Sequence, residues 1–130
     1  MALTAASLLI APGTAQAAPT ARAYAGECGS GFVQIDSFPL STGATVYLTY
    51  SSATGNNCVI TKRDTVGTAQ LVGAAIRRAG DPASEDIDSG NYTSYAGPVY
   101  VNAPGSCIDW GGEYLDDLQQ RFNDHCGFKK

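Results

Sequence analysis

The sequence predicts an all-β fold: a small, disulfide-braced sandwich or barrel of about six to eight antiparallel strands, with room for one short C-terminal helix. Short apolar segments alternate with glycine, proline, asparagine and serine over most of the chain, and several of these segments alternate apolar with polar residues. The 130 residues are enough for one domain with its own core. They contain four cysteines, Cys28, Cys58, Cys107 and Cys126.

The N-terminal residues have the pattern of a secretory signal peptide. Residues 1–10 form an apolar run, a Pro-Gly pair interrupts it, and Ala15-Gln16-Ala17 supplies small residues where signal peptidase cuts. No lysine or arginine precedes the run, so the basic n-region is missing. The run is also shorter than the ~20 residues that cross a bilayer, so we expect no membrane span.

These features divide the chain into three parts. We expect a signal peptide at 1–17, a disordered lead-in at 18–26 and a single β-rich domain at 27–130. The protein is therefore predicted to be secreted.

The first half of the domain reads as three strands. Residues 32–38 give the first, which ends near Pro39. Residues 44–50 alternate between two faces and give the second, and residues 57–63 return as its partner after a turn at 51–56. This hairpin has the strongest local signal in the chain.

The second half is more ambiguous. Residues 68–80 fit a helix by apolar spacing and a strand by alternation, while residues 81–90 read as an acidic loop. Residues 92–101 and 106–110 are predicted to form a second hairpin around a Pro-Gly turn. The apolar residues of 113–122 have the spacing of a short amphipathic helix.

The cysteines predict two disulfides rather than a metal site. No pair has CxxC spacing, and the single histidine, His125, adjoins Cys126. The two predicted hairpins share a Val-Tyr strand followed by a strand that opens with cysteine, so Cys58 and Cys107 would hold equivalent positions. We therefore predict a Cys58–Cys107 bond and, by remainder, Cys28–Cys126, although four cysteines permit three pairings.

Motifs spread over nearly the whole of the predicted domain resemble the actinobacterial spore-associated protein A family. They are Cys-Gly-Ser-Gly at 28–31, Thr-Gly-Asn-Asn-Cys-Val at 54–59, Tyr-Ala-Gly-Pro-Val at 95–99 and Cys-Ile-Asp-Trp-Gly-Gly at 107–112. The resemblance implies a small secreted protein found with spores and aerial growth, without an established activity or catalytic residues. It also favours a strand at 68–78.

Several residue groups are candidate functional sites. Five aromatic residues in the C-terminal half could form a ligand or partner surface, although a buried tryptophan covering a disulfide would explain one of them. They are Tyr92, Tyr95, Tyr100, Trp110 and Tyr114. The Asp86-Ile87-Asp88 stretch lacks the spacing of an EF-hand and reads as a solvated loop.

No catalytic set emerges from the sequence. A carboxylate pair for glycoside hydrolysis could come from Asp109, Glu113, Asp116 and Asp117, but acids at that density equally suit a helix N-terminus. His125 lies beside a cysteine, and no Gly-x-Ser-x-Gly elbow accompanies it. We expect no enzymatic activity, no catalytic residues, no metal and no cofactor.

The net charge of −4 argues against a nucleic-acid partner, which would require a basic face. We expect a secreted, non-enzymatic protein of the cell surface or spore coat, whose partners are cell-wall or spore-surface components. The alternative is a carbohydrate- or protease-binding module that uses a tyrosine-rich hairpin or loop.

Overall fold

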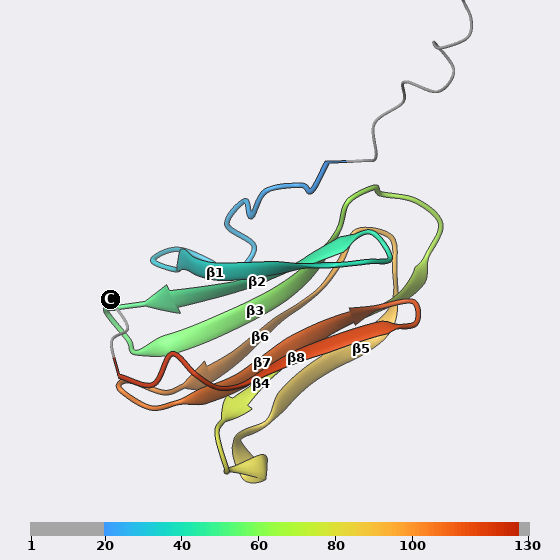
Figure 1. The fold of residues 1–130 in the computed structure, drawn as a ribbon. Helices are drawn as coiled ribbons and strands as arrows, with labels where there is room; N and C mark the ends of the chain where they lie inside the picture. Colours follow the sequence, from blue (N-terminus) through green and yellow to red (C-terminus); the bar gives the residue numbers. More distant parts are fainter. Residues whose placement is uncertain (1–19, 128–130) are drawn as a thin grey trace, which may run out of the picture.

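The computed structural model describes residues 20–127 as two four-stranded antiparallel sheets packed face to face (Figure 1). One sheet has the order β1-β2-β3-β6 and the other the order β5-β4-β7-β8. The strands are β1 (Val33–Leu40), β2 (Ala44–Ser51), β3 (Asn56–Arg63), β4 (Gln70–Arg78), β5 (Asp86–Tyr92), β6 (Tyr95–Asn102), β7 (Ile108–Tyr114) and β8 (Asp117–Asp124). The all-β sandwich with eight strands and two disulfides confirms the predicted fold class.

The predicted signal peptide at 1–17 lies outside the described residues. Within 20–127, no helix is long and apolar enough to cross a membrane. The single short helical element there is the 3-10 turn η2 (Pro82–Ser84) between β4 and β5.

The β2–β3 hairpin forms where the sequence predicts it. Its register runs from Ala44 opposite Arg63 to Ser51 opposite Asn56, and every residue of β2 is buried. Gly55 closes the turn with φ of +76°, a conformation that glycine adopts without steric cost, and its N–H donates to the Ser51 carbonyl.

The main core lies between the sheets and collects the inward-facing apolar residues of both. Trp110 on β7 packs against Phe38 on β1 with ring centroids 5.0 Å apart, and only 2% of Trp110 is exposed. Gly112, two residues along β7, permits a close approach of the sheets, because a Cβ there would lie 2.8 Å from Val46 Cγ2 and closer still to Thr61 Oγ1.

A second, smaller core covers the opposite face of the β1-β2-β3-β6 sheet. It consists of Cys28, Tyr47, Cys58 and Ile60, with Tyr24 and Phe32 packed against it. The N-terminal segment 20–32, blue in Figure 1, supplies the cover. This explains why β2 and β3 are buried on both faces.

The described part of the predicted lead-in therefore takes a defined path. Arg22 donates from Nε to the Arg63 carbonyl at 2.7 Å and from Nη2 to the Ser94 carbonyl at 3.0 Å. Tyr47 Oη donates to the Arg22 carbonyl, and Lys62 Nζ donates to the Ala23 carbonyl. The expectation of disorder for 18–26 was wrong for residues 20–26, because this segment supplies the hydrogen-bond acceptors for the side chains of Tyr47 on β2 and Lys62 on β3.

Glu27 closes the same contact through an ion pair with Lys62. Burial acts to raise the pKa of Glu27, but hydrogen bonds from Lys62 and from the Ala25 N–H outweigh it, so its pKa lies below the ordinary value.

The predicted disulfide pairing was wrong. The bonds are Cys28–Cys58 and Cys107–Cys126. Cys58 lies in the small outer core, on the face of β3 that points away from the other sheet, so it meets the N-terminal segment. Cys107 and Cys126 flank the open end of the β7–β8 hairpin, where Ile108 pairs with Asp124.

The predicted second hairpin is also absent, since β6 and β7 belong to different sheets. β6 pairs with β3, with Val99 opposite Val59, whereas β7 pairs with β4, with Trp110 opposite Ile76. The Pro104-Gly105 turn carries the chain from one layer to the other.

Three further segments resolve into strands. Residues 70–78 form β4, as the family resemblance implied. The predicted acidic loop at 81–90 contains η2 and most of β5. The predicted helix at 113–122 is instead the turn and second strand of the β7–β8 hairpin, in which Leu115 has φ of +58°. Apolar residues four apart share a face in a strand as well as in a helix, which is why the pattern misled.

Candidate functional site

The outer face of the β5-β4-β7-β8 sheet exposes a group of large apolar side chains. Ile87 on β5 is 62% exposed, and Leu118 and Phe122 on β8 are 59% and 58% exposed. The register places Ile87 beside Ala75 and Leu118 beside Glu113, on the face that points away from the core. We call this surface the open face, because the N-terminal segment covers the other sheet instead (Figure 1).

The open face carries a shallow groove made of two adjoining hollows of about 220 and 160 Å³. Both hollows contact Ala75 and Gly111, so residues with almost no side chain form the floor in the middle of the sheet. Ile87 borders the groove on the β5 side, and Leu118 and Phe122 border it on the β8 side. The hollow between Ile87 and Leu118 is mainly apolar, whereas the hollow beside Phe122 is lined more by polar groups.

Charged groups stand at the two ends of this groove. Arg77 Nε donates to Asp109 Oδ2 at 3.0 Å, and Asp109 Oδ1 also accepts from the Asn123 N–H at 3.0 Å. At the other end Ser89 Oγ donates to Glu113 Oε1 at 2.9 Å. Asp109 and Glu113 are four residues apart on one strand, about 13 Å between Cα atoms, and each is held by its own partner. The structure thus places these two sequence-predicted carboxylates in different hollows of the groove.

The five predicted aromatic site residues do not gather on one surface. Trp110 and Tyr114 are buried in the main core, so their structural interpretation is the one that fits. Tyr95 is half-buried on β6. Tyr100 Oη donates to the Cys28 carbonyl, and burial followed by the charge of Asp86 raises the pKa of Tyr100.

Tyr92 and the acidic residues of β5 form hydrogen bonds within the fold instead of an aromatic surface. Asp86 Oδ2 accepts from the Tyr100 N–H at 2.9 Å, and Asp88 Oδ2 accepts from the Gly97 N–H at 2.8 Å. The two carboxylates thus cap main-chain donors on the edge strand β6. Tyr92 Oη donates to Asp88 Oδ1, and this hydrogen bond raises the pKa of Tyr92. The solvated loop predicted for these acids was wrong.

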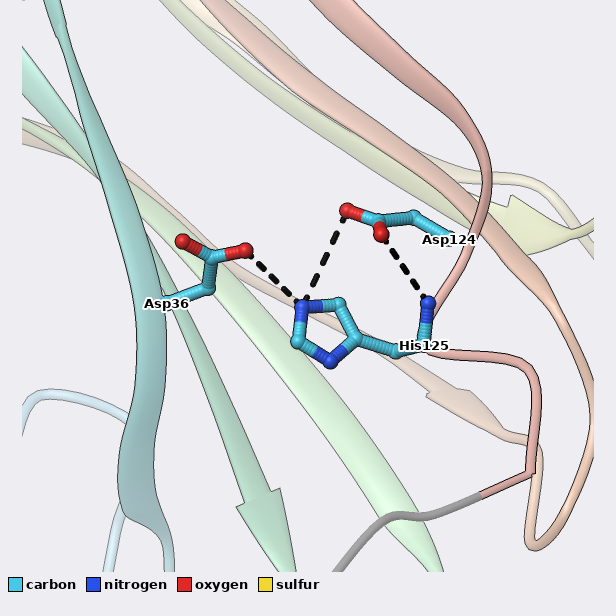
Figure 2. A group of neighbouring side chains, drawn as sticks. All are labelled: Asp36, Asp124 and His125. Atoms are coloured by element: carbon cyan, nitrogen blue, oxygen red, sulfur yellow. Dashed lines mark hydrogen bonds and ion pairs between the residues drawn. The ribbon is translucent and has the colours of Figure 1, made fainter.

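Three polar side chains converge where β1 meets the end of β8 (Figure 2). His125 Nε2 lies 2.9 Å from Asp36 Oδ2 and 3.7 Å from Asp124 Oδ2. The facing ligand atoms of Asp36, Asp124 and His125 all lie within 4.8 Å of one another, and each side chain is partly buried. Among the described residues, these are the ones that could together hold a metal ion.

Local hydrogen bonds fix both carboxylates of this Asp-Asp-His cluster. Asp36 Oδ1 accepts from the Ser37 N–H at 2.8 Å, and Asp124 Oδ1 accepts from the His125 N–H at 3.1 Å. Trp110 Nε1 donates to Asp124 Oδ2 at 3.0 Å from the core.

Sequence reasoning considered His125 and set it aside, and it missed both aspartates. Asp36 and His125 are separated by 89 residues and by a change of sheet, so no local spacing could connect them. The open face was not predicted, because a glycine or alanine in a strand does not by itself indicate a groove on the surface of the sheet. The signal available was the alternation of β8, which its helix-like spacing concealed.

The fold and the two disulfide bonds define the class of protein, which is a small, disulfide-braced antiparallel β-sandwich. Over 129 residues the chain is 45% identical to spore-associated protein A of Streptomyces coelicolor. The alignment covers 97% of this chain and 82% of that protein. The chain belongs to the spore-associated protein A family. No family model matches it, and no solved structure matches it.

Proposed function

We propose that this protein is a secreted, non-enzymatic component of the outer surface of the cell or spore. The observation that carries the proposal is the 45% identity to a spore-associated protein over nearly the whole chain. The two disulfides support it, because such bonds form and persist in oxidising surroundings outside the cytoplasm.

The open face is the surface through which we propose that the protein attaches. Exposed apolar side chains that gather over one sheet mark interaction sites more often than isolated ones do. Here Ile87, Leu118 and Phe122 border one groove, whereas the exposed Val33 and Val66 line none of the hollows described above. A broad, shallow surface suits an extended cell-wall or coat component better than a small molecule.

Fractionation of the organism that makes the protein tests both statements. The wild-type protein is expected in the washed spore or cell-surface fraction. Ile87→Ser/Leu118→Ser/Phe122→Ser is expected to move most of it to the culture fluid. Val33→Ser/Val66→Ser removes exposed apolar area elsewhere and should leave the distribution unchanged.

Two results would overturn the proposal. Recovery of the wild-type protein only as free protein in the medium would contradict the location. Turnover of a substrate that Asp109→Asn abolishes in a folded variant would contradict the non-enzymatic role.

A further inference from the structure

We propose that Asp36, Asp124 and His125 form a binding site for a divalent transition-metal ion, with Zn²⁺ as the ion that fits best. The site would join the two sheets, because Asp36 belongs to β1 while Asp124 ends β8 and His125 follows it. This inference stands apart from the proposed surface role, because its three ligand residues line neither hollow of the open face.

The spacing of the donor atoms fits one ion. Zinc binds carboxylate oxygen and imidazole nitrogen at about 2.0–2.2 Å, so ligands at angles of about 90–110° lie about 2.9–3.5 Å apart. In the Asp-Asp-His cluster the imidazole nitrogen lies 2.9 and 3.7 Å from the two carboxylate oxygens. The two carboxylate oxygens lie within 4.8 Å of each other, so they would have to approach one another by up to about 1.3 Å to surround one centre with the imidazole nitrogen.

The carboxylates are oriented before any ion arrives. Each aspartate uses Oδ1 to accept a main-chain N–H, from Ser37 in one case and from His125 in the other. Each thereby turns Oδ2 toward the same imidazole nitrogen. Trp110 Nε1 donates to Asp124 Oδ2 as well, which is the outer-shell support that metal-ligating groups usually receive.

The charges and the accessibility also fit. Two carboxylates face one ring nitrogen, which can donate a single hydrogen bond, and that nitrogen lies within hydrogen-bond distance of Asp36 alone. A divalent cation would neutralise both. The side chains of Asp36, Asp124 and His125 are 31%, 35% and 23% exposed, so water can complete the coordination. Figure 2 shows the second ring nitrogen of His125 facing away from both carboxylates, and it would carry the ring proton when the first nitrogen binds the ion.

The donor set selects the kind of ion. One imidazole nitrogen with two carboxylate oxygens suits zinc and its neighbours in the first transition series. Calcium requires six to eight oxygen ligands and magnesium a nearly octahedral set of oxygens, and three donors including nitrogen serve neither well.

Calorimetric titration of the full-length, disulfide-bonded protein with ZnCl₂, without a polyhistidine tag and at neutral pH, tests the site. We expect one ion per chain and no competition from CaCl₂. Asp36→Asn and His125→Gln should each weaken binding at least about tenfold, as losing a ligand costs no less than losing an outer-shell partner. Asp116→Asn removes an exposed carboxylate at the β7–β8 turn and should bind like the wild type.

A second readout reports where the ion lies. Trp110 is the single tryptophan and contacts Asp124 directly, so Co²⁺ bound in the cluster should quench its fluorescence in the wild type and in Asp116→Asn. Quenching should be lost in Asp36→Asn. Near-UV circular dichroism of this variant verifies that it is folded, so its result does not depend on the folding of His125→Gln. Absence of saturable binding by the folded wild type would overturn the proposal. Unchanged affinity in Asp36→Asn would overturn it too, because the ion would then lie elsewhere.

Discussion

Replacing Cys28 and Cys58 by serine tests the role of the N-terminal segment as the cover of one sheet. The bond closes a loop with a sequence separation of 30 residues. In the chain-entropy relation, its removal gives the unfolded state an advantage of about 3.6 kcal/mol at 25 °C. That is a large share of the ~5–15 kcal/mol by which a domain of this kind is stable. We expect a loss of about 3–4 kcal/mol in the free energy of unfolding, measured by guanidinium denaturation.

The matched variant Cys107→Ser/Cys126→Ser separates this general effect from the local one. Its separation of 19 residues gives about 3.2 kcal/mol, so the two variants should be nearly equal in stability. They should differ in trypsin cleavage after Arg22, whose guanidinium is held by the Arg63 and Ser94 carbonyls. Without the Cys28–Cys58 bond the segment should open locally and Arg22 should be cut rapidly.

The comparison is made under conditions in which near-UV circular dichroism shows both variants folded. Equal protection of Arg22 in the two variants would refute the idea that the disulfide holds the cover in place. A loss below about 1 kcal/mol for Cys28→Ser/Cys58→Ser would refute the entropic estimate.

Three further predictions concern packing, pH and the capped edge. Gly112→Ala should cost at least about 1–3 kcal/mol in thermal unfolding, because the new Cβ meets Val46 and Thr61 across the core, whereas Gly73→Ala, which meets the movable side chain of Glu113, should cost clearly less. Glu27→Gln should lose about 1.5–3 kcal/mol at neutral pH. Because the folded pKa of Glu27 lies below 4.5, its contribution to the free energy of unfolding is present above that pH and is lost as pH falls through the folded pKa. Urea titrations over a range of pH should therefore show a smaller loss of stability on acidification for Glu27→Gln than for the wild type. An equal loss in the two proteins would contradict the assignment. Asp88→Ala should leave the Gly97 N–H without its acceptor and cost about 1–3 kcal/mol, with faster amide exchange at Gly97 than in Ser89→Ala.

Local patterns predicted what local contacts determine. The β2–β3 hairpin was predictable because both strands alternate and the turn between them is short, and this hairpin alone indicated an antiparallel β domain. Residues 92–110 show the limit. A Pro-Gly turn between two strands looks the same whether the second strand pairs with the first or crosses to the other layer, and here it crosses.

The disulfides and the candidate sites could not be predicted for a related reason. Pairing Cys58 correctly requires knowing that β3 is covered on its outer face by residues far upstream, which no periodicity reveals. The Asp-Asp-His cluster likewise depends on the edge of β1 meeting the end of β8. Trp110 was a candidate for the aromatic surface with a buried position near a cysteine as the alternative, and the buried position is the one that the structure has.

The carboxylates of Asp86 and Asp88 do for β6 what a ninth strand would otherwise do. A main-chain donor that already has an acceptor is not available to another molecule, so the edge of β6 resists the strand-by-strand stacking that leads to fibrils. If the protein lies on a cell or spore surface as proposed, such protection would allow dense packing of folded copies without pairing between their sheets.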